Sequence, residues 1–294
     1  MVGLLSGIMS DSSDSDSGSM PELVDTIDGS VEEPETFMKG FLAVTPDDAD
    51  SSGIENLCKQ LFKHFEVDVK ELAELLVRQN YVTTVLKEEV DEPAADPDDD
   101  GTVYGVYSAV NLKNNKDNPF VKQVVNWMLT HAGQSVEGNV LKQLLDFEGN
   151  HPNTTGLLIK EKVVNIPGVA TCPFMKQLIN DLETATENGM QYNFTHFVHV
   201  AKMVKIKHEP EYFVDQDDEI IHKNHTRFFD VNYPSSVDSG IIFQNQSGSS
   251  IYGKAFRRIY VFTKAQLTDF MNELQNIEGM NNLMAEAASS GLKI

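Results

Sequence analysis

The chain has 294 residues, of which 40% are hydrophobic, so it can bury a substantial core without disulfides or a structural metal. Its two cysteines, Cys58 and Cys172, give neither a disulfide framework nor a Cys-rich zinc motif, and a reducing compartment fits them best. No apolar run approaches the roughly 20 residues that a membrane-spanning helix requires. We therefore expect an intracellular protein that does not span a membrane.

The net charge of −22 is concentrated in two parts of the chain. Residues 1–52 carry twelve acidic residues and one basic residue, Lys39, while residues 88–100 carry eight acidic residues and no basic one. Together these segments hold a charge of −19, which leaves −3 for the rest of the chain. The sequence thus predicts an almost neutral folded part with two strongly acidic appendages.

Composition also predicts where the domain begins and ends. Residues 1–36 are rich in Ser, Asp and Glu and hold few large apolar groups, which is typical of disorder. Residues 88–101 have the same character, and Pro93 and Pro97 oppose regular structure there. We predict a disordered acidic tail over 1–36, one α/β domain over 37–278 with a disordered acidic loop at 88–101, and a flexible tail over 279–294.

Apolar residues at helical spacing predict six helices. The patterns Ser52–Glu55 and Thr263–Gln266 resemble capping boxes, and Asn118 precedes a proline at a first helical position. In chain order the helices lie near residues 54–65, 69–79, 119–132, 141–145, 173–188 and 264–277.

Segments rich in Tyr, Phe, Val and Ile predict strands between these helices. In 194–205 the apolar residues fall on both faces over part of the run, which indicates a central strand covered on both sides. The predicted strands are 41–45, 81–86, 103–112, 156–164, 194–205, 227–233, 241–245 and 258–263. This order of elements favours a single α/β domain with a mixed central sheet flanked by helices.

Histidines raise the question of a metal site. Three-residue spacing in a strand sends His196 and His199 to opposite faces. A second pair, His222 and His225, has the same spacing, and with Asp217, Asp218 and Glu219 it could form a surface metal site. No zinc-type signature surrounds these residues, so solvated or core histidines are the expected interpretation and no metal is predicted.

Motifs for other chemistry are missing from the sequence. It contains no phosphate-binding loop, no Gly-x-Gly-x-x-Gly and no Gly-x-Ser-x-Gly, so neither a cofactor nor a catalytic residue is predicted. Cys172 precedes Pro173 at a helix start, where the dipole could favour a thiolate, although a structural cysteine is the preferred interpretation. The densest basic pair is Arg257-Arg258, too small a patch for an acidic protein to bind nucleic acid.

Seven further blocks of sequence form an ordered set. The blocks are GIENLCKQLF (53–62), LAELLVRQNYVTTVLK (72–87), VYGVYSAVNL (103–112), TGLLIKEKVVNIP (155–167), FTHFVHVAK (194–202), RFFDVNY (227–233) and RRIYVFTKAQLTDFMNEL (257–274). Together they resemble the BCCIP family. They follow one another in the family's order over most of residues 41–277, and the ordered set is more specific than any single block.

This resemblance implies a domain similar in topology to the GCN5-related acetyltransferases but without acetyltransferase function, and the chain has no Arg-x-x-Gly-x-Gly/Ala loop for coenzyme A. It also implies a nuclear protein that shuttles to the cytoplasm and acts as a chaperone for a basic protein of the large ribosomal subunit. A cyclin-dependent kinase inhibitor and a recombination mediator are the other implied partners. Some relatives carry a Lys-rich insertion where Glu209–Asp218 of this chain holds no lysine, which puts a self-contained nuclear import signal in doubt.

A flexible acidic segment could cover the Lys/Arg surface of such a client as a substitute for phosphate, while the folded domain supplies selective contacts. The predicted partner-binding residues are Glu88, Glu89, Asp91, Glu92, Asp96, Asp98, Asp99 and Asp100. Three other interpretations stay open: the acidic segments only solubilise the protein, the protein is an adaptor for cell-cycle and repair proteins, or it is an unrecognised transferase.

Overall fold

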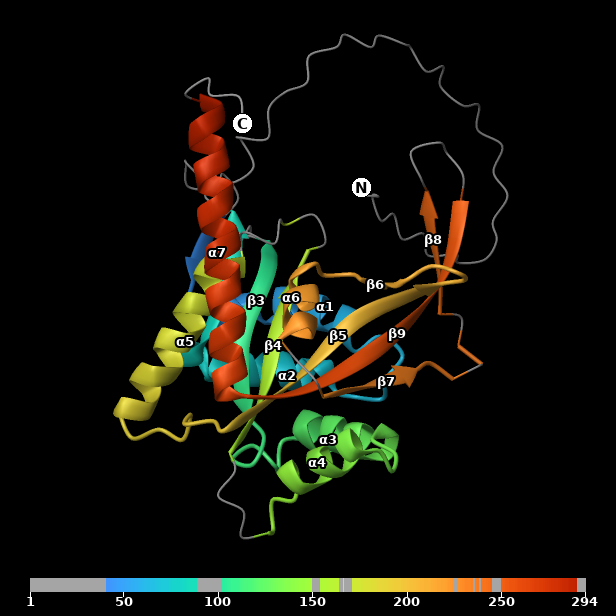
Figure 1. Ribbon diagram of the computed structural model, residues 1–294. Helices are drawn as coiled ribbons and strands as arrows, with labels where there is room; N and C mark the ends of the chain where they lie inside the picture. Colours follow the sequence, from blue (N-terminus) through green and yellow to red (C-terminus); the bar gives the residue numbers. More distant parts are fainter. Residues whose placement is uncertain are drawn as a thin grey trace, which may run out of the picture.

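The computed structural model describes residues 41–88, 102–149, 154–163, 166, 171–224, 227–234, 236–237, 239–244 and 250–289 (Figure 1). These residues form one mixed sheet with helices on both faces, which confirms the predicted fold class. The predicted tail over 1–36 lies outside the described residues. None of the helices in the described ranges is both long and apolar enough to cross a membrane.

The sheet has nine strands in the order β1-β2-β3-β4-β5-β9-β7, with β6 beside β5 and β8 beside β9. All pairs are antiparallel except β4–β5, which is parallel. The strands are β1 (Phe41–Val44), β2 (Thr83–Glu88), β3 (Val103–Asn111), β4 (Thr155–Lys162), β5 (His196–Ile206), β6 (Glu211–Phe213), β7 (Phe228–Asn232), β8 (Gly240–Gln244) and β9 (Ser250–Thr263).

The helices begin largely where the sequence predicts. The side chain of Asn118 accepts a hydrogen bond from the amide of Val121, and Thr263 and Gln266 bond each other's backbone amides, so both predicted caps are confirmed. The helices are α1 (Ser51–Leu61), α2 (Val69–Arg78), α3 (Pro119–His131), α4 (Val136–Leu144), α5 (Thr171–Glu187), α6 (Asp217–Lys223) and α7 (Lys264–Ser289), with short 3-10 helices at Asp48–Asp50 and Asn80–Val82.

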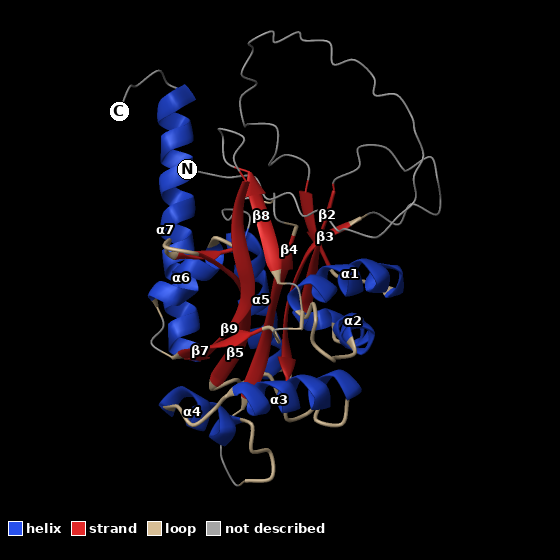
Figure 2. Ribbon diagram, turned by 90° about the vertical axis from the view of Figure 1, so that its right-hand side faces the viewer, coloured by secondary structure: helices blue, strands red, loops and turns tan. Residues whose placement is uncertain are grey.

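Two apolar clusters lie on opposite faces of the sheet. Residues of α1, α2, α3 and α4 form the first cluster, which includes Val198 of β5. Residues of α5, α6 and α7 form the second, which includes Phe197. Figure 2 shows α1 and α2 on one side of the strands and α6 and α7 on the other. Because consecutive residues of β5 enter different clusters, the prediction that this strand is covered on both faces is confirmed.

The start of α1 differs from the predicted capping box at Ser52 and Glu55. The reciprocal bonds form earlier: the amide of Ala49 donates to Asp47, and the amide of Asp47 donates to Asp50. The chain is already helical at Asp48, and the 3-10 helix runs directly into α1. Ser52 therefore lies inside the first helical turn, where its side chain is no longer at a capping position.

Besides the two 3-10 helices, two elements are absent from the prediction, β6 with three residues and α6 with seven, because such short segments show no clear periodicity. Strand β9 begins at Ser250, eight residues before the predicted start. Helix α7 continues to Ser289, where a flexible tail from residue 279 is expected. Residues 279–289 contain Ala, Leu, Met and Glu, whose high helix propensity sustains the helix.

Candidate functional site

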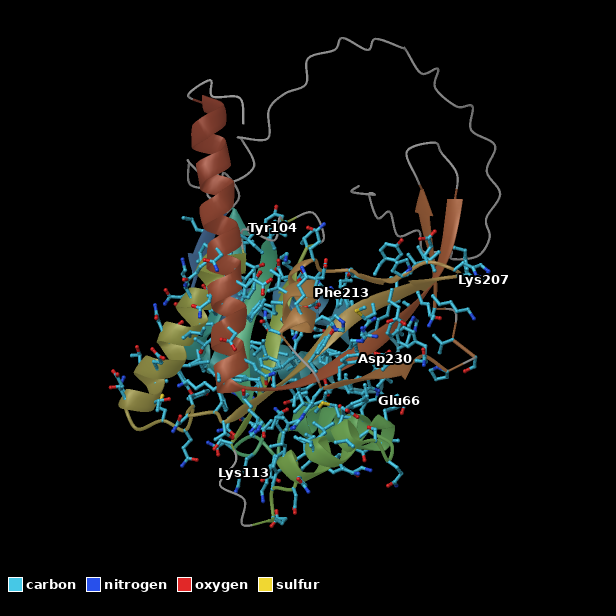
Figure 3. The ribbon with its side chains drawn as sticks, viewed as in Figure 1. Glu66, Tyr104, Lys113, Lys207, Phe213 and Asp230 are labelled. Atoms are coloured by element: carbon cyan, nitrogen blue, oxygen red, sulfur yellow. The ribbon has the colours of Figure 1, made fainter. Side chains whose placement is uncertain are left out.

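The β1–β2 pair brings the two acidic segments to one place. Phe41 lies opposite Glu88, so the chain enters the sheet and leaves this pair at the same end. Residues 1–40 and 88–100 carry seventeen acidic residues and one basic residue between them. We call the paired ends Phe41 and Glu88 the acidic corner, and Tyr104, labelled in Figure 3, lies near the same end of the sheet because Lys87 pairs with Val103.

Of the eight predicted partner-binding residues, the structure describes the backbone of Glu88 alone. Glu88 is the last residue of β2 and not part of a loop, because pairing with β1 prolongs β2 two residues beyond Leu86. The boundary of the predicted loop is thus corrected by one residue. The other seven lie outside the described residues: Glu89, Asp91, Glu92, Asp96, Asp98, Asp99 and Asp100.

Charges around β1 are mainly negative. The ammonium of Lys87 lies 2.5 Å from a carboxylate oxygen of the buried Asp50, so this cation is neutralised within the fold. Asp47 and Asp48 are exposed beyond the other end of β1. Leu42, within β1, is 45% exposed. The strand therefore presents an apolar side chain, with exposed acidic residues beyond one end and the acidic corner at the other.

A second group of charges is buried beneath the sheet. Lys160 and Lys162 extend from β4 toward Asp215, Asp217 and Asp218 at the start of α6, and we call these five residues the ion cluster. The Lys160 ammonium lies 2.6 Å from Asp215 and 3.1 Å from Asp218, and the Lys162 ammonium lies 2.7 Å from Asp215 and 2.5 Å from Asp217. The ion cluster fastens α6 to the centre of the sheet.

For most residues of the ion cluster, the neighbouring charges together shift the pKa more than burial does. Burial alone would lower the pKa of Lys160, but the three carboxylates hold that pKa well above its ordinary value. Burial would raise the pKa of Asp215, but Lys160 and Lys162 lower it. Asp217 is the exception, since burial raises its pKa despite both lysines. The lysines and Asp215 are thus held in their charged forms at neutral pH.

The ion cluster lies where β4 and β5 no longer pair with each other. Strands β4 and β5 pair only from Thr155 with His196 to Leu158 with His199, and β4 runs on to Lys162 without pairing with β5. On the α1 face, Lys202 of β5 reaches across to Glu161 of β4 at 2.6 Å. On the other face, the Nε2 atom of His199 lies 2.9 Å from Asp218. Charged side chains therefore fill both faces of the region where the two parallel strands separate.

A family model for BCCIP matches residues 40–228, well over half of the chain. The chain belongs to the BCCIP family. This confirms the resemblance drawn from the ordered sequence blocks, and the matched range includes β1 at its start and the whole ion cluster.

Individual relatives agree with this membership. The Drosophila melanogaster protein named Protein BCCIP homolog is 28% identical over 80% of this chain and 82% of its own length. The human BRCA2 and CDKN1A-interacting protein is 32% identical, but the match covers 49% of this chain and about half, 46%, of the human protein. The crystal structure of BCP1 from Saccharomyces cerevisiae has a TM-score of 0.54 at 15% identity, over 82% of this chain and 90% of that one, which shows a shared fold. A likeness to agmatine N-acetyltransferase has a TM-score of 0.34, too low to carry an argument about activity.

The histidine group named as a possible metal site is not assembled among the described residues. Asp217 and Asp218 point inward to the ion cluster, while Glu219 pairs with Lys223 on the surface. The Nδ1 atom of His222 lies 3.1 Å from the Tyr260 hydroxyl, and burial lowers the pKa of His222. His225 lies outside the described residues, and nowhere in the described ranges do three His, Cys, Asp or Glu side chains form a potential metal site.

A surface cleft of about 580 Å³ lies beside α6, β6 and β9. Its acidic residues are already engaged, since Glu211 contacts Arg258 at 2.6 Å and Glu219 contacts Lys223 at 3.4 Å. Figure 3 shows Phe213 beside α6, where it lines this cleft. The full lining is Glu211, Tyr212, Phe213, Gln216, Glu219, His222, Lys223 and Arg258. With both signs of charge balanced, the cleft offers little electrostatic preference for either a cation or an anion.

The basic pair Arg257-Arg258 is turned into the protein. Arg257 is 4% exposed and donates to the carbonyl oxygens of Gln60 and Leu61 at the end of α1, at 2.7 Å each. Arg258 is 5% exposed and binds Asp230 at 2.7 Å. Both guanidinium groups are engaged in contacts within the protein, so this pair does not form a basic surface for nucleic acid.

Sequence reasoning did not find the ion cluster, although a signal exists. Lys160 and Lys162 occupy alternate positions of an apolar strand, which places both on one buried face. Two buried ammonium groups require nearby carboxylates. The run of acids at 215–218 supplies them, but this partnership between distant segments becomes visible only when α6 is placed.

Proposed function

We propose that this protein is a non-enzymatic escort for a basic client, such as a protein of the large ribosomal subunit, and that it supports ribosome assembly and nuclear export. The observation that supports this most directly is the acidic corner, where Phe41 and Glu88 pair and join both acidic segments to one end of the sheet. A client rich in Lys and Arg would meet seventeen acidic residues attached side by side.

Attachment of both segments at the acidic corner would strengthen the attraction. When two binding segments are tethered at one point, contact of the first raises the local concentration of the second around the same client. The folded part of the chain carries little net charge, so it would add shape-dependent selectivity and not further general attraction. Nuclear residence with passage to the cytoplasm is part of the proposal, and imaging of the tagged full chain in cells tests it.

Binding of purified large-subunit ribosomal proteins to the full chain at increasing salt tests the escort role. Neutralising the acids at 89, 91, 92, 96, 98, 99 and 100 to Asn or Gln should weaken binding and reduce its salt dependence. The matched control neutralises seven exposed acids elsewhere: Glu66, Asp117, Glu148, Glu183, Glu187, Glu209 and Asp269. Equal effects of the two variants would contradict a localised binding segment and would support a purely solubilising one.

A second candidate function is that of an adaptor for cell-cycle and DNA-repair proteins. The human relative is named for its interaction with BRCA2 and CDKN1A, and it is 32% identical over the matched region. Adaptor contacts made by the folded domain should survive neutralisation of the acidic segments. Binding of purified CDKN1A or BRCA2 fragments to the neutralised variant distinguishes the two functions, because loss of this binding would argue against the adaptor role.

A further inference from the structure

Strand β1 lies at one edge of the described sheet. β1 stands at the end of the strand order and pairs with β2, and no second strand pairs with it within the described ranges. Within the described part of the chain, the backbone amide and carbonyl groups along its outer edge therefore have no strand partner. Such a row is a template on which an extended segment of another chain can add a strand.

The other terminal strand is less accessible. β7 contacts α4, and Figure 1 shows α3 and α4 below this end of the sheet. Its residue Asp230 is also held by Arg258 at 2.7 Å. Of these two terminal strands, β1 is the one that lies beside the acidic corner.

Charge indicates which kind of strand this edge accepts. The acidic segments join the sheet at one end of β1, and Asp47 and Asp48 are exposed beyond its other end. The nearby Lys87 is neutralised by Asp50. A second copy of this chain would bring the same negative charges to the interface and be repelled, whereas a cationic segment would be attracted.

We propose that the outer edge of β1 binds an extended Lys/Arg-rich segment of the partner by β-strand addition. The inference rests on the proposed function for the cationic character of the client, and it adds the site and the mode of contact. β1 has four residues, about 13 Å of strand, which suits a partner segment of four or five residues.

The exposed side chain of Leu42 adds a sequence preference. Leu42 and Val44 lie on the same face of β1, and Val44 packs against the first apolar cluster. A partner residue beside Leu42 on that face would bury apolar area. The preferred segment therefore alternates aliphatic and basic residues, with aliphatic side chains toward α1.

A direct test uses the unmodified full chain and an eight-residue probe of alternating Lys and Val. The control probe has the same sequence with N-methyl groups on two adjacent central residues. Because adjacent amides point to opposite edges of a strand, each edge of this probe lacks one hydrogen-bond donor. Both probes have the same charge. We expect the N-methylated probe to bind at least about tenfold more weakly in calorimetry, because backbone pairing is lost while long-range attraction remains.

Two variants locate the contact. Leu42→Lys and Val136→Lys each replace an exposed aliphatic side chain by lysine and change the net charge equally, but Val136 lies on α4. We expect Leu42→Lys to weaken binding of the unmodified probe several-fold more than Val136→Lys. Thermal unfolding of each variant confirms that the fold is retained.

The outcomes separate this inference from the escort function. Equal affinity for the two probes would overturn strand addition and leave attraction by the acidic segments intact. Failure of both probes and of the purified ribosomal proteins to bind at low salt would overturn both. A dimer that dissociates on Leu42→Lys substitution would show that a second copy occupies the edge, which also overturns the inference.

Discussion

The ammonium nitrogen of Lys160 lies 2.6 Å from a carboxylate oxygen of Asp215, inside the protein, where Lys160 is 1% exposed. Lys160→Met removes the cation and leaves carboxylates facing a low-dielectric interior. We expect this substitution to lower the free energy of unfolding by about 3–5 kcal/mol, as when one partner of a buried ion pair is removed. Urea unfolding followed by circular dichroism measures the change.

The matched control for Lys160→Met is Lys116→Met. Lys116 lies 2.8 Å from Glu148, a similar distance, but the two side chains are 45% and 84% exposed. Exposed pairs contribute about 0–1 kcal/mol, so little change is expected. A loss from Lys160→Met as small as that from Lys116→Met would show that the ion cluster does not hold α6 in place.

The ion cluster also predicts a loss of stability in alkali. Burial would lower the pKa values of Lys160 and Lys162, but neighbouring carboxylates raise both above the ordinary 10.5. Because the folded-state pKa lies above the unfolded one, this stabilisation is fully present below pH 10.5 and is lost as pH rises through the folded-state pKa. Burial raises the pKa of Tyr107 to about 12, which acts in the same direction.

We therefore expect the free energy of unfolding to fall above pH 10.5, and to fall less steeply in Lys160→Met. Urea unfolding at several pH values between neutrality and the alkaline limb gives both slopes. Parallel slopes in the two proteins would contradict a role for Lys160 in this pH dependence.

At low pH, the carboxylates of the ion cluster take up protons, and the stability of the fold changes with them. Burial would raise the pKa values of Asp215 and Asp218, but neighbouring cations lower both below the ordinary 3.8. Their contribution is present above pH 3.8 and is lost as pH falls through the folded-state values. Asp217, whose pKa burial raises, offsets part of this. We expect Asp215→Asn to flatten the acid limb of the stability curve, and an unchanged limb would contradict this assignment.

Sequence patterns predicted the elements with strong periodicity. The central strand around Val198 and the caps at Asn118 and Thr263 follow from local spacing and local hydrogen bonding, which the sequence records directly. Elements whose formation depends on tertiary contacts were not predicted. Helix α6 is short and depends on the ion cluster, so its formation is decided by Lys160 and Lys162, more than fifty residues earlier.

The candidate site, too, could be predicted only in part from the sequence. Acidic segments can be identified from composition, but their meeting point depends on the pairing of Phe41 with Glu88, residues that are far apart in the chain. The seven predicted partner-binding residues from Glu89 to Asp100 lie outside the described residues, and their role stays a prediction. Likewise, composition alone could not show that Arg257 and Arg258 are internal.

Arg257 gives a prediction about the end of α1. Its guanidinium donates to the carbonyl oxygens of Gln60 and Leu61, which have no partner within the helix. A lysine has one compact donor centre and cannot span both oxygens in this geometry. We expect Arg257→Lys to lower the free energy of unfolding by about 1–3 kcal/mol, the cost of a buried polar group left unpaired.

Arg78→Lys is the control for this substitution. Arg78 lies in the last turn of α2, is 58% exposed and reaches Glu74 at 3.8 Å. Surface substitutions of this kind change stability by at most about 0.5 kcal/mol. If the two Arg→Lys variants unfold at the same urea concentration, the guanidinium contacts of Arg257 contribute nothing measurable.

The two cysteines predict slow thiol chemistry in the native protein. Cys58 and Cys172 are not joined in a disulfide, and both are 0% exposed. Burial raises the pKa of Cys58 far above its ordinary 9.0. Thiolate is the reactive form, so an aromatic disulfide reagent should modify neither cysteine in the folded state and both after unfolding in urea. Rapid reaction of one thiol in native Cys58→Ala would instead reveal an activated Cys172 at the start of α5. Such a result would revive the thiolate interpretation that the position before Pro173 suggests.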